Sequence, residues 1–64
     1  MEVTMKRIKY VVQRDVYAGW EDWACYLVAD VAIRVRDEMI EMVNNGCRGP
    51  GERWRAIRRE ESAL

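Results

Sequence analysis

The sequence contains no histidine, only two cysteines and a single serine among its 64 residues. Because two thiols cannot complete the four-coordinate site that zinc prefers, Cys25 and Cys47 predict no bound metal, and no motif for another cofactor is present. The serine, Ser62, has no histidine to activate it, and no glycine-rich stretch has the spacing of a phosphate-binding loop. We therefore identify no catalytic residue and expect a protein that is not an enzyme.

The sequence also lacks a long apolar run. No stretch approaches the roughly 20 apolar residues that a helix needs to cross a bilayer. The first ten residues, MEVTMKRIKY, contain no apolar segment of the kind found in signal peptides. We therefore expect no membrane partner and a cytoplasmic protein in which both cysteines stay reduced.

The chain is short for a folded domain. A domain of this size buries only about 60% of the surface that its unfolded chain exposes, so self-association is one common source of extra stability. Its 11 basic and 11 acidic residues cancel, but they are spread unevenly. Four basic residues and no acid occur in 6–14, seven acids and two arginines in 15–45, and five arginines and three acids in 46–64.

Two arginine-containing segments alternate between apolar and polar residues in the manner of β-strands. In KRIKYVVQR (6–14), Ile8, Tyr10 and Val12 share one face, because successive side chains of a strand point to opposite faces. ERWRAIRRE (52–60) predicts a further strand of the same kind. Its two faces carry Trp54 and Ala56 on one side, and Arg53, Arg55, Ile57 and Arg59 on the other.

Between these segments, WEDWACYLV (20–28) predicts another strand, which follows a turn at 15–19. Its more apolar set is expected to face inward, so that Trp20 and Tyr26 face outward. A one-residue bulge would reverse this assignment. The inward set consists of Glu21, Trp23, Cys25 and Leu27.

The clearest helix lies between Asp30, a residue type that caps helix N-termini, and Gly46, a residue type common just after the last turn. The following segment, GCRGPG (46–51), contains glycine and proline and cannot continue the helix. Apolar residues recur inside the helix every three or four positions, which predicts one buried stripe. The stripe consists of Ala32, Val35, Met39, Met42 and Val43.

Together these segments predict an α+β domain with the element order ββαβ. If the first strand is central, the helix carries the chain across the sheet, so that the third strand pairs beside the first. This gives a three-stranded antiparallel sheet of order 2-1-3 with one helix packed on one face and the other face open. The single domain covers residues 1–64, with flexible ends expected at 1–5 and 61–64.

The open sheet face is the first candidate binding surface. Cations contact phosphates and aromatic rings stack on bases, so a face with both is typical of proteins that bind single-stranded nucleic acid. Such domains are usually clearly basic, whereas this chain has no net charge, which favours an ordinary solvated sheet face. The candidate residues are Arg7, Lys9, Trp20, Tyr26, Arg53, Arg55 and Arg59.

The helix offers a second candidate surface. Asp37, Glu38 and Glu41 form an acidic face that would dock on a basic partner, although a solvated helix face has the same pattern. By contrast, Glu21 and Asp22 are not a catalytic pair, because neighbours on a strand point to opposite faces and cannot converge on one bond. The WEDW segment therefore mainly serves the fold: its acids are expected to solvate one side and to pair with strand arginines, and Trp20 is the residue expected to contact a partner.

Three segments, YVVQRDVYAGWEDW, ADVAIRVRDEM and ERWRAIRRE, resemble a group of small, mostly uncharacterised phage and prophage proteins. The resemblance covers about residues 6–61 and rests on a pattern of strands and helix, so it transfers no active-site residue. It implies a protein that acts on host machinery by occupying a surface, as anti-CRISPR proteins do.

Three functional hypotheses follow. The leading one is a binding protein that occupies a surface of a host protein complex in the host cell cytoplasm, as an anti-defence inhibitor. The second is an accessory protein that binds nucleic acid through the open sheet face. The third is a homodimer in which the open sheet faces of two copies are buried against each other.

Overall fold

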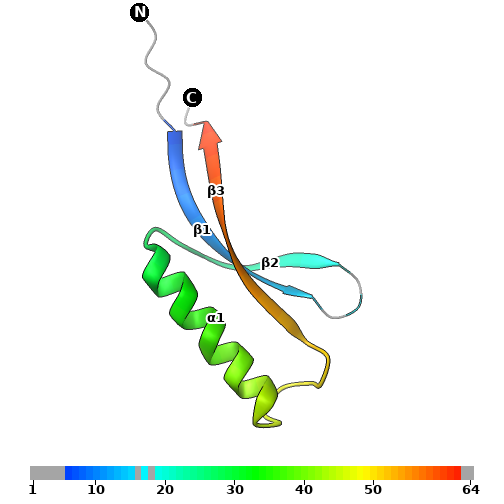
Figure 1. Cartoon of the computed structure of the whole chain (residues 1–64). Helices are drawn as coiled ribbons and strands as arrows, with labels where there is room; N and C mark the ends of the chain where they lie inside the picture. Colours follow the sequence, from blue (N-terminus) through cyan, green and yellow to red (C-terminus); the bar gives the residue numbers. More distant parts are fainter. Residues whose placement is uncertain (1–5, 16, 18, 63–64) are drawn as a thin grey trace, which may run out of the picture.

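The computed structural model describes residues 6–15, 17 and 19–62, and it has the predicted ββαβ order (Figure 1). A long strand is followed by a shorter strand, one helix and a second long strand. The alternating segments thus become strands, and the segment with helical periodicity becomes the helix. The elements are β1 (Lys6–Asp15), β2 (Trp20–Tyr26), α1 (Ala29–Asn44) and β3 (Arg53–Ser62).

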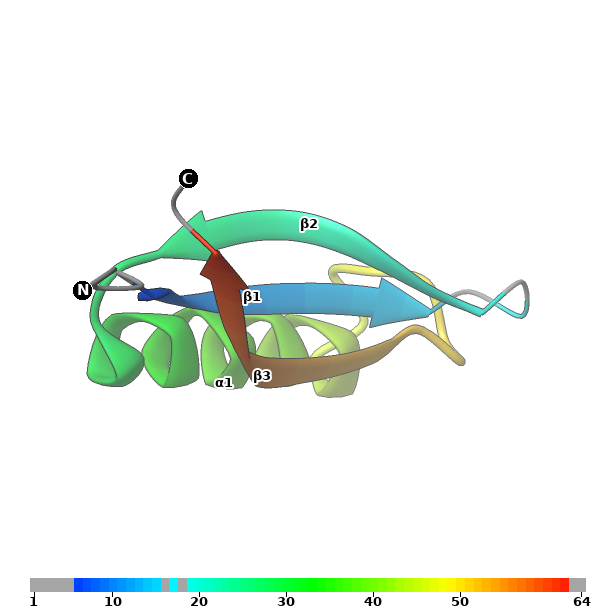
Figure 2. The ribbon, with the colours of Figure 1, turned by 90° about the horizontal axis from the view of Figure 1, so that it is seen from above.

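The three strands form one antiparallel sheet in the order β2-β1-β3, as predicted. β1 is central because it pairs with both of the other strands, and α1 crosses one face of the sheet without covering the other (Figure 2). The paired ends of β1 and β3 extend beyond the start of the helix (Figure 1). The predicted three-stranded sheet with one helix on one face is confirmed.

The hydrophobic core lies between α1 and the sheet. Val12, Ala32 and Trp54 are buried together, with exposed fractions of 0%, 0% and 6%. The predicted stripe of the helix is largely confirmed, but Met42 is wrong, because its side chain is 43% exposed. The partly buried residues that complete the core are Tyr10, Tyr26, Val35, Met39, Val43 and Ala56.

A β-bulge in β2 decides which side chains of that strand reach the core. The register with β1 shifts between Val12 and Gln13, so that Val12 pairs with Ala24 and Gln13 pairs with Asp22. Trp23 is the extra residue, and the alternation of faces restarts after it. For this reason the outward prediction for Tyr26 and the inward prediction for Cys25 are both wrong: Tyr26 packs against the core and Cys25 lies on the other face.

The two ends of the helix differ in how well the sequence predicted them. The N-cap is Val28, whose side chain makes no capping bond, so the prediction of Asp30 as the cap is wrong and Asp30 lies in the first turn. At the other end, Gly46 adopts a positive φ of 79°. The amide of Gly46 donates to the Val43 carbonyl and that of Cys47 to the Met42 carbonyl, which is the Schellman pattern of helix termination.

The end at 61–64 that was predicted to be flexible overlaps the last residues of β3. Glu61 and Ser62 are paired with Arg7 and Lys6, so their backbone belongs to the sheet. The backbone pairing of β1 and β3 continues this far because both strands are ten residues long and fully matched. The predicted ends at 1–5 and 63–64 lie outside the described residues.

Candidate functional site: the open sheet face and the outer helix face

The sheet face opposite α1, here called the open face, collects one residue set from each strand. The pairs Val11 with Cys25 and Val11 with Ile57 fix this set, because directly paired residues of antiparallel strands point to the same face. Six of the seven predicted binding residues belong to it, and Tyr26 does not. The charged and aromatic members are Arg7, Lys9, Asp15, Trp20, Asp22, Arg53, Arg55, Arg59 and Glu61.

The centre of the open face is a hydrogen-bonded network around Asp22. Arg59 donates two bonds to its carboxylate, with N–O distances of 2.7 and 3.2 Å, and the amide of Gln13 donates a third at 2.8 Å. Arg55 in turn donates to the Gln13 carbonyl oxygen at 2.8 Å. The bonds from Arg59 and then from Gln13 lower the pKa of Asp22 from 3.8 to about 2.

This network also covers the sheet where no helix does. Arg59 lies on β3 and Asp22 on β2, so their ion pair bridges the two edge strands across β1. On β1, Lys9 is paired with Arg59 and Gln13 with Asp22 in the strand register. Val11 lies between Lys9 and Gln13 on the same face, and its side chain is 0% exposed. The long arginine stem therefore shields an apolar residue on the face that α1 leaves uncovered.

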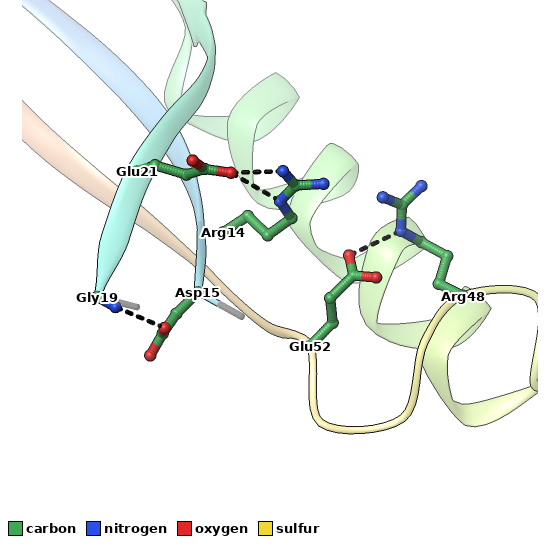
Figure 3. A network of polar contacts seen from close by, with 6 residues as sticks. All are labelled: Arg14, Asp15, Gly19, Glu21, Arg48 and Glu52. Atoms are coloured by element: carbon green, nitrogen blue, oxygen red, sulfur yellow. Dashed lines mark hydrogen bonds and ion pairs between the residues drawn. The ribbon is translucent and has the colours of Figure 1, made fainter. Parts of the chain in front are cut away.

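A second carboxylate, Asp15, anchors the turn between β1 and β2. It is only 3% exposed, and it accepts a bond from the Gly19 amide at 3.1 Å (Figure 3) and another from the guanidinium of Arg53. The bond from Arg53 and those from the turn backbone lower the pKa of Asp15. The predicted binding residue Arg53 thus already has an anionic partner within the chain.

Lys9, Trp20 and Arg55 on the open face are engaged as well, whereas Arg7 is exposed and forms no ion pair with another described residue. The guanidinium groups of Arg53 and Arg55 lie 5.2 and 4.2 Å from the centroid of the Trp20 ring, a cation–π geometry. Lys9 forms an ion pair with Glu61 at 2.6 Å. The ring of Trp20 is therefore already in contact with two arginines of the same chain, and a nucleic-acid base would have to displace them to stack on it.

On the helix side, the WEDW segment serves packing. The rings of Trp23 and Trp54 meet edge to face, with centroids 5.3 Å apart and planes at 86°. Glu21 accepts a hydrogen bond from the Nε atom of Arg14, 3.0 Å away (Figure 3). Glu21 lies on the opposite face of β2 from Asp22. The prediction that the two acids point to opposite faces and pair with strand arginines is confirmed.

A further ion pair lies beside the core residue Trp54, after the end of the helix. Arg48 bonds Glu52 at 2.9 Å, and its guanidinium lies 5.2 Å from the centroid of the Trp54 ring (Figure 3). The indole Nε1 of Trp54 is buried without a hydrogen-bond partner among the described residues. The ring is thus held by apolar, aromatic and cationic contacts rather than by its polar atom.

The outer face of α1 has the opposite character. Asp30, Arg34, Glu38 and Glu41 are exposed and form no ion pair with another described residue. Asp37, the remaining member of the predicted acidic face, instead pairs with its neighbour Arg36 at 2.8 Å. The acids of the helix are therefore available to a partner, whereas three of the five open-face cations, Lys9, Arg53 and Arg59, are paired with carboxylates of the same chain.

Sequence reasoning found the arginines of the open face and the pairing of Asp22 with a strand arginine, but it missed the roles of Gln13 and Asp15. Gln13, Asp15 and Asp22 were not named as site residues, although their polarity at strand positions was a usable signal. Their partners lie 9 to 42 residues away in the chain, so only the strand register identifies them.

Within the described residues there is no group of acidic or cysteine side chains that would hold a metal ion, no pocket, and no helix long and apolar enough to span a membrane. Cys25 and Cys47 are exposed free thiols. No family model, curated protein or solved structure matches the chain. The surfaces themselves therefore carry the functional argument.

Proposed function

We propose that the protein binds a host protein complex through the outer face of α1 and inhibits it by occupying that surface. The observation that carries this proposal is the contrast between the two charged faces. The open-face cations Lys9, Arg53 and Arg59 are paired with carboxylates of the same chain, whereas Glu38 and Glu41 on the helix have no partner among the described residues.

The chemistry of the outer face indicates a basic partner surface. Asp30, Glu38 and Glu41 outnumber Arg34, the one cation among these unpaired residues. A charge excess on one face raises the rate of encounter with an oppositely charged surface and disfavours partners of like charge. The resemblance to phage proteins adds the host as the source of the partner, with the cytoplasm as the compartment where they meet.

Reversing the charge of the outer face should weaken this binding. The immobilised protein would first retain its partner from host lysate at a near 1:1 ratio, and the purified partner would then be titrated by calorimetry. We expect the E38K/E41K variant to bind at least tenfold more weakly, about 1.4 kcal/mol. The E38D/E41D variant, which keeps both charges, is the matched control and should bind like the unaltered chain. Equal affinity of all three chains would contradict the proposal.

Nucleic-acid binding through the open face is a second candidate, favoured by one observation. Arg55 lies over Trp20 at 4.2 Å and forms no ion pair with a carboxylate of the described residues. It is the weaker candidate because Arg59 and Arg53 would have to leave Asp22 and Asp15 before they reached phosphates. A third hypothesis, two open faces buried on each other, has less support, because Val11 at the centre of this face is already covered within one chain.

A further inference from the structure

The N-terminal part of β1 has one edge without a neighbouring strand among the described residues. β2 pairs with β1 only from Tyr10 to Asp15, whereas β3 pairs with β1 from Lys6 onward. Lys6–Lys9, here called the free edge, therefore has a strand on the β3 side alone, where the sheet extends beyond the start of the helix (Figure 1). Because alternate residues of a strand direct their N–H and C=O groups to opposite sides, about half of these residues present both groups to the unpaired side.

The side chains around the free edge differ in character between the two faces of the sheet. On the open face, Arg7 is exposed and forms no ion pair with another described residue. On the helix side, Ile8 is 39% exposed, and Leu27 and Val28, which link the end of β2 to α1, are 84% and 55% exposed. A strand added to this edge would thus meet an unpaired cation on one face and apolar side chains on the other.

The outer edges of the sheet are less suited to accept a strand. The bulge at Trp23 interrupts the regular alternation of β2, and bulges are one means by which edge strands avoid pairing. On β3, Arg58 and Glu60 form an ion pair at 2.9 Å, and none of the exposed large apolar side chains of the described residues belongs to this strand. The free edge of β1 is therefore the one that combines unpaired backbone groups with an unpaired cation and apolar neighbours.

We propose that the free edge binds an extended acidic peptide segment of a partner protein, which adds a strand in line with β2. In such strand additions the backbone bonds give affinity and the alternating side chains give specificity. An acid of the segment would lie beside Arg7 on the open face, and its apolar neighbour would lie beside Ile8 on the helix side. Charge disfavours a second copy of the chain, because three of the four residues in KRIK (6–9) are basic and two such edges would place like charges opposite each other.

This site goes beyond the proposed function and is independent of it. The outer face of α1 carries unpaired acids and suits a basic partner, whereas the free edge suits an acidic one. The two proposals are tested at different residues, Glu38 and Glu41 on the helix and Arg7 on β1. The failure of either one would therefore leave the other intact.

Fluorescence anisotropy of a labelled peptide gives the test. The probe is an octapeptide of alternating glutamate and valine, kept at trace concentration and titrated with the full chain up to about 1 mM, because such a short edge buries less than the roughly 1,200 Å² of a stable interface. We expect saturable binding. A peptide of alternating lysine and valine reverses the charge, and N-methylation of all amides of the original peptide removes the donors of a strand. Each change should weaken binding at least tenfold.

The matched pair of protein variants is Arg7→Glu and Arg34→Glu, which make the same charge reversal at two exposed arginines. The variant at Arg7 should bind the peptide at least tenfold more weakly, and the variant at Arg34 should bind like the unaltered chain. Circular dichroism confirms that each is folded, and Arg7→Gln replaces the first if it is not. Nuclear magnetic resonance should show slower amide exchange within Lys6–Lys9 when the peptide is added. No saturable binding, equal affinity of the N-methylated peptide, or equal weakening by both variants would overturn the proposal.

Discussion

Replacing Trp54 with alanine is expected to remove a large share of the protein's stability. Trp54 is 6% exposed, packs with Val12 and Ala32, and meets the edge of Trp23. Truncating a buried tryptophan to alanine costs about 3–5 kcal/mol. A domain of this length has a total stability of roughly 3–10 kcal/mol, so this one change removes a large share or all of it. Urea unfolding followed by circular dichroism measures the loss.

The matched control is Trp23→Ala at the other ring of the same pair. Trp23 is 42% exposed, so its removal loses the aromatic contact and part of its buried area but opens no large cavity. We expect a cost of about 1–2 kcal/mol and a chain that remains folded. Equal unfolding midpoints for the two variants would contradict the assignment of Trp54 to the core.

Acid should remove the stability that the Asp22 network supplies. The folded-state pKa of Asp22 is about 2, below its ordinary value of 3.8, because Arg59 and Gln13 donate to the charged carboxylate. The folded state therefore takes up this proton less readily than the unfolded chain. The contribution is complete above pH 3.8 and is lost as the pH falls through about 2. We expect Asp22→Asn to be less stable than the unaltered chain at pH 7, with the difference vanishing near pH 2.

Chemical denaturation at a series of pH values between 7 and 2 measures this difference. Glu38→Gln is the control, because it removes an exposed carboxylate that has no ion-pair partner among the described residues. It should leave the pH dependence of stability unchanged. A gap between Asp22→Asn and the unaltered chain that stays constant down to pH 2 would show that the carboxylate's charge is not what the network uses.

The alternation of β1 and β3 and the spacing of α1 were enough to predict the fold. Ile8, Tyr10 and Val12 repeat with the period of a strand, while Ala32, Val35 and Met39 repeat with that of a helix, and these two periods admit few ways to bury one face. Strand order followed from the same reasoning, because a helix between the second and third strands carries the chain across the first.

The bulge at Trp23 was not predictable in the same way. Period-two reasoning assigns every second residue to one face, and a single inserted residue reverses all later assignments. Trp23 and Tyr26 both lie on the helix side of β2, which strict alternation would not allow, because Trp23 is the extra residue. The ring of Trp23 meets that of Trp54, and this contact depends on the pairing of strands far apart in the chain.

The sequence predicted the cations of the candidate site and the pairing of Asp22 with a strand arginine, but not the roles of Asp15 and Gln13. Arg53, Arg55 and Arg59 are visible as a repeating pattern within one segment. Their partners Asp15, Gln13 and Asp22 belong to β1 and the start of β2, so they become neighbours only once the register is set. The open face is therefore less basic in the folded chain than its arginines suggest, because Asp15, Asp22 and Glu61 offset three of its five cations.

The central claim is that carboxylates of the same chain pair with the open-face cations Lys9, Arg53 and Arg59, which leaves the helix as the surface for a partner. Its most direct test is tryptophan fluorescence during titration with mixed-sequence single- and double-stranded oligonucleotides, at about 50 and 200 mM salt. Trp20 lies under Arg53 and Arg55, so it reports on any ligand that displaces them. We expect no saturable change in fluorescence at either salt concentration. Saturable quenching that weakens as salt increases would contradict the claim and assign the open face to nucleic acid.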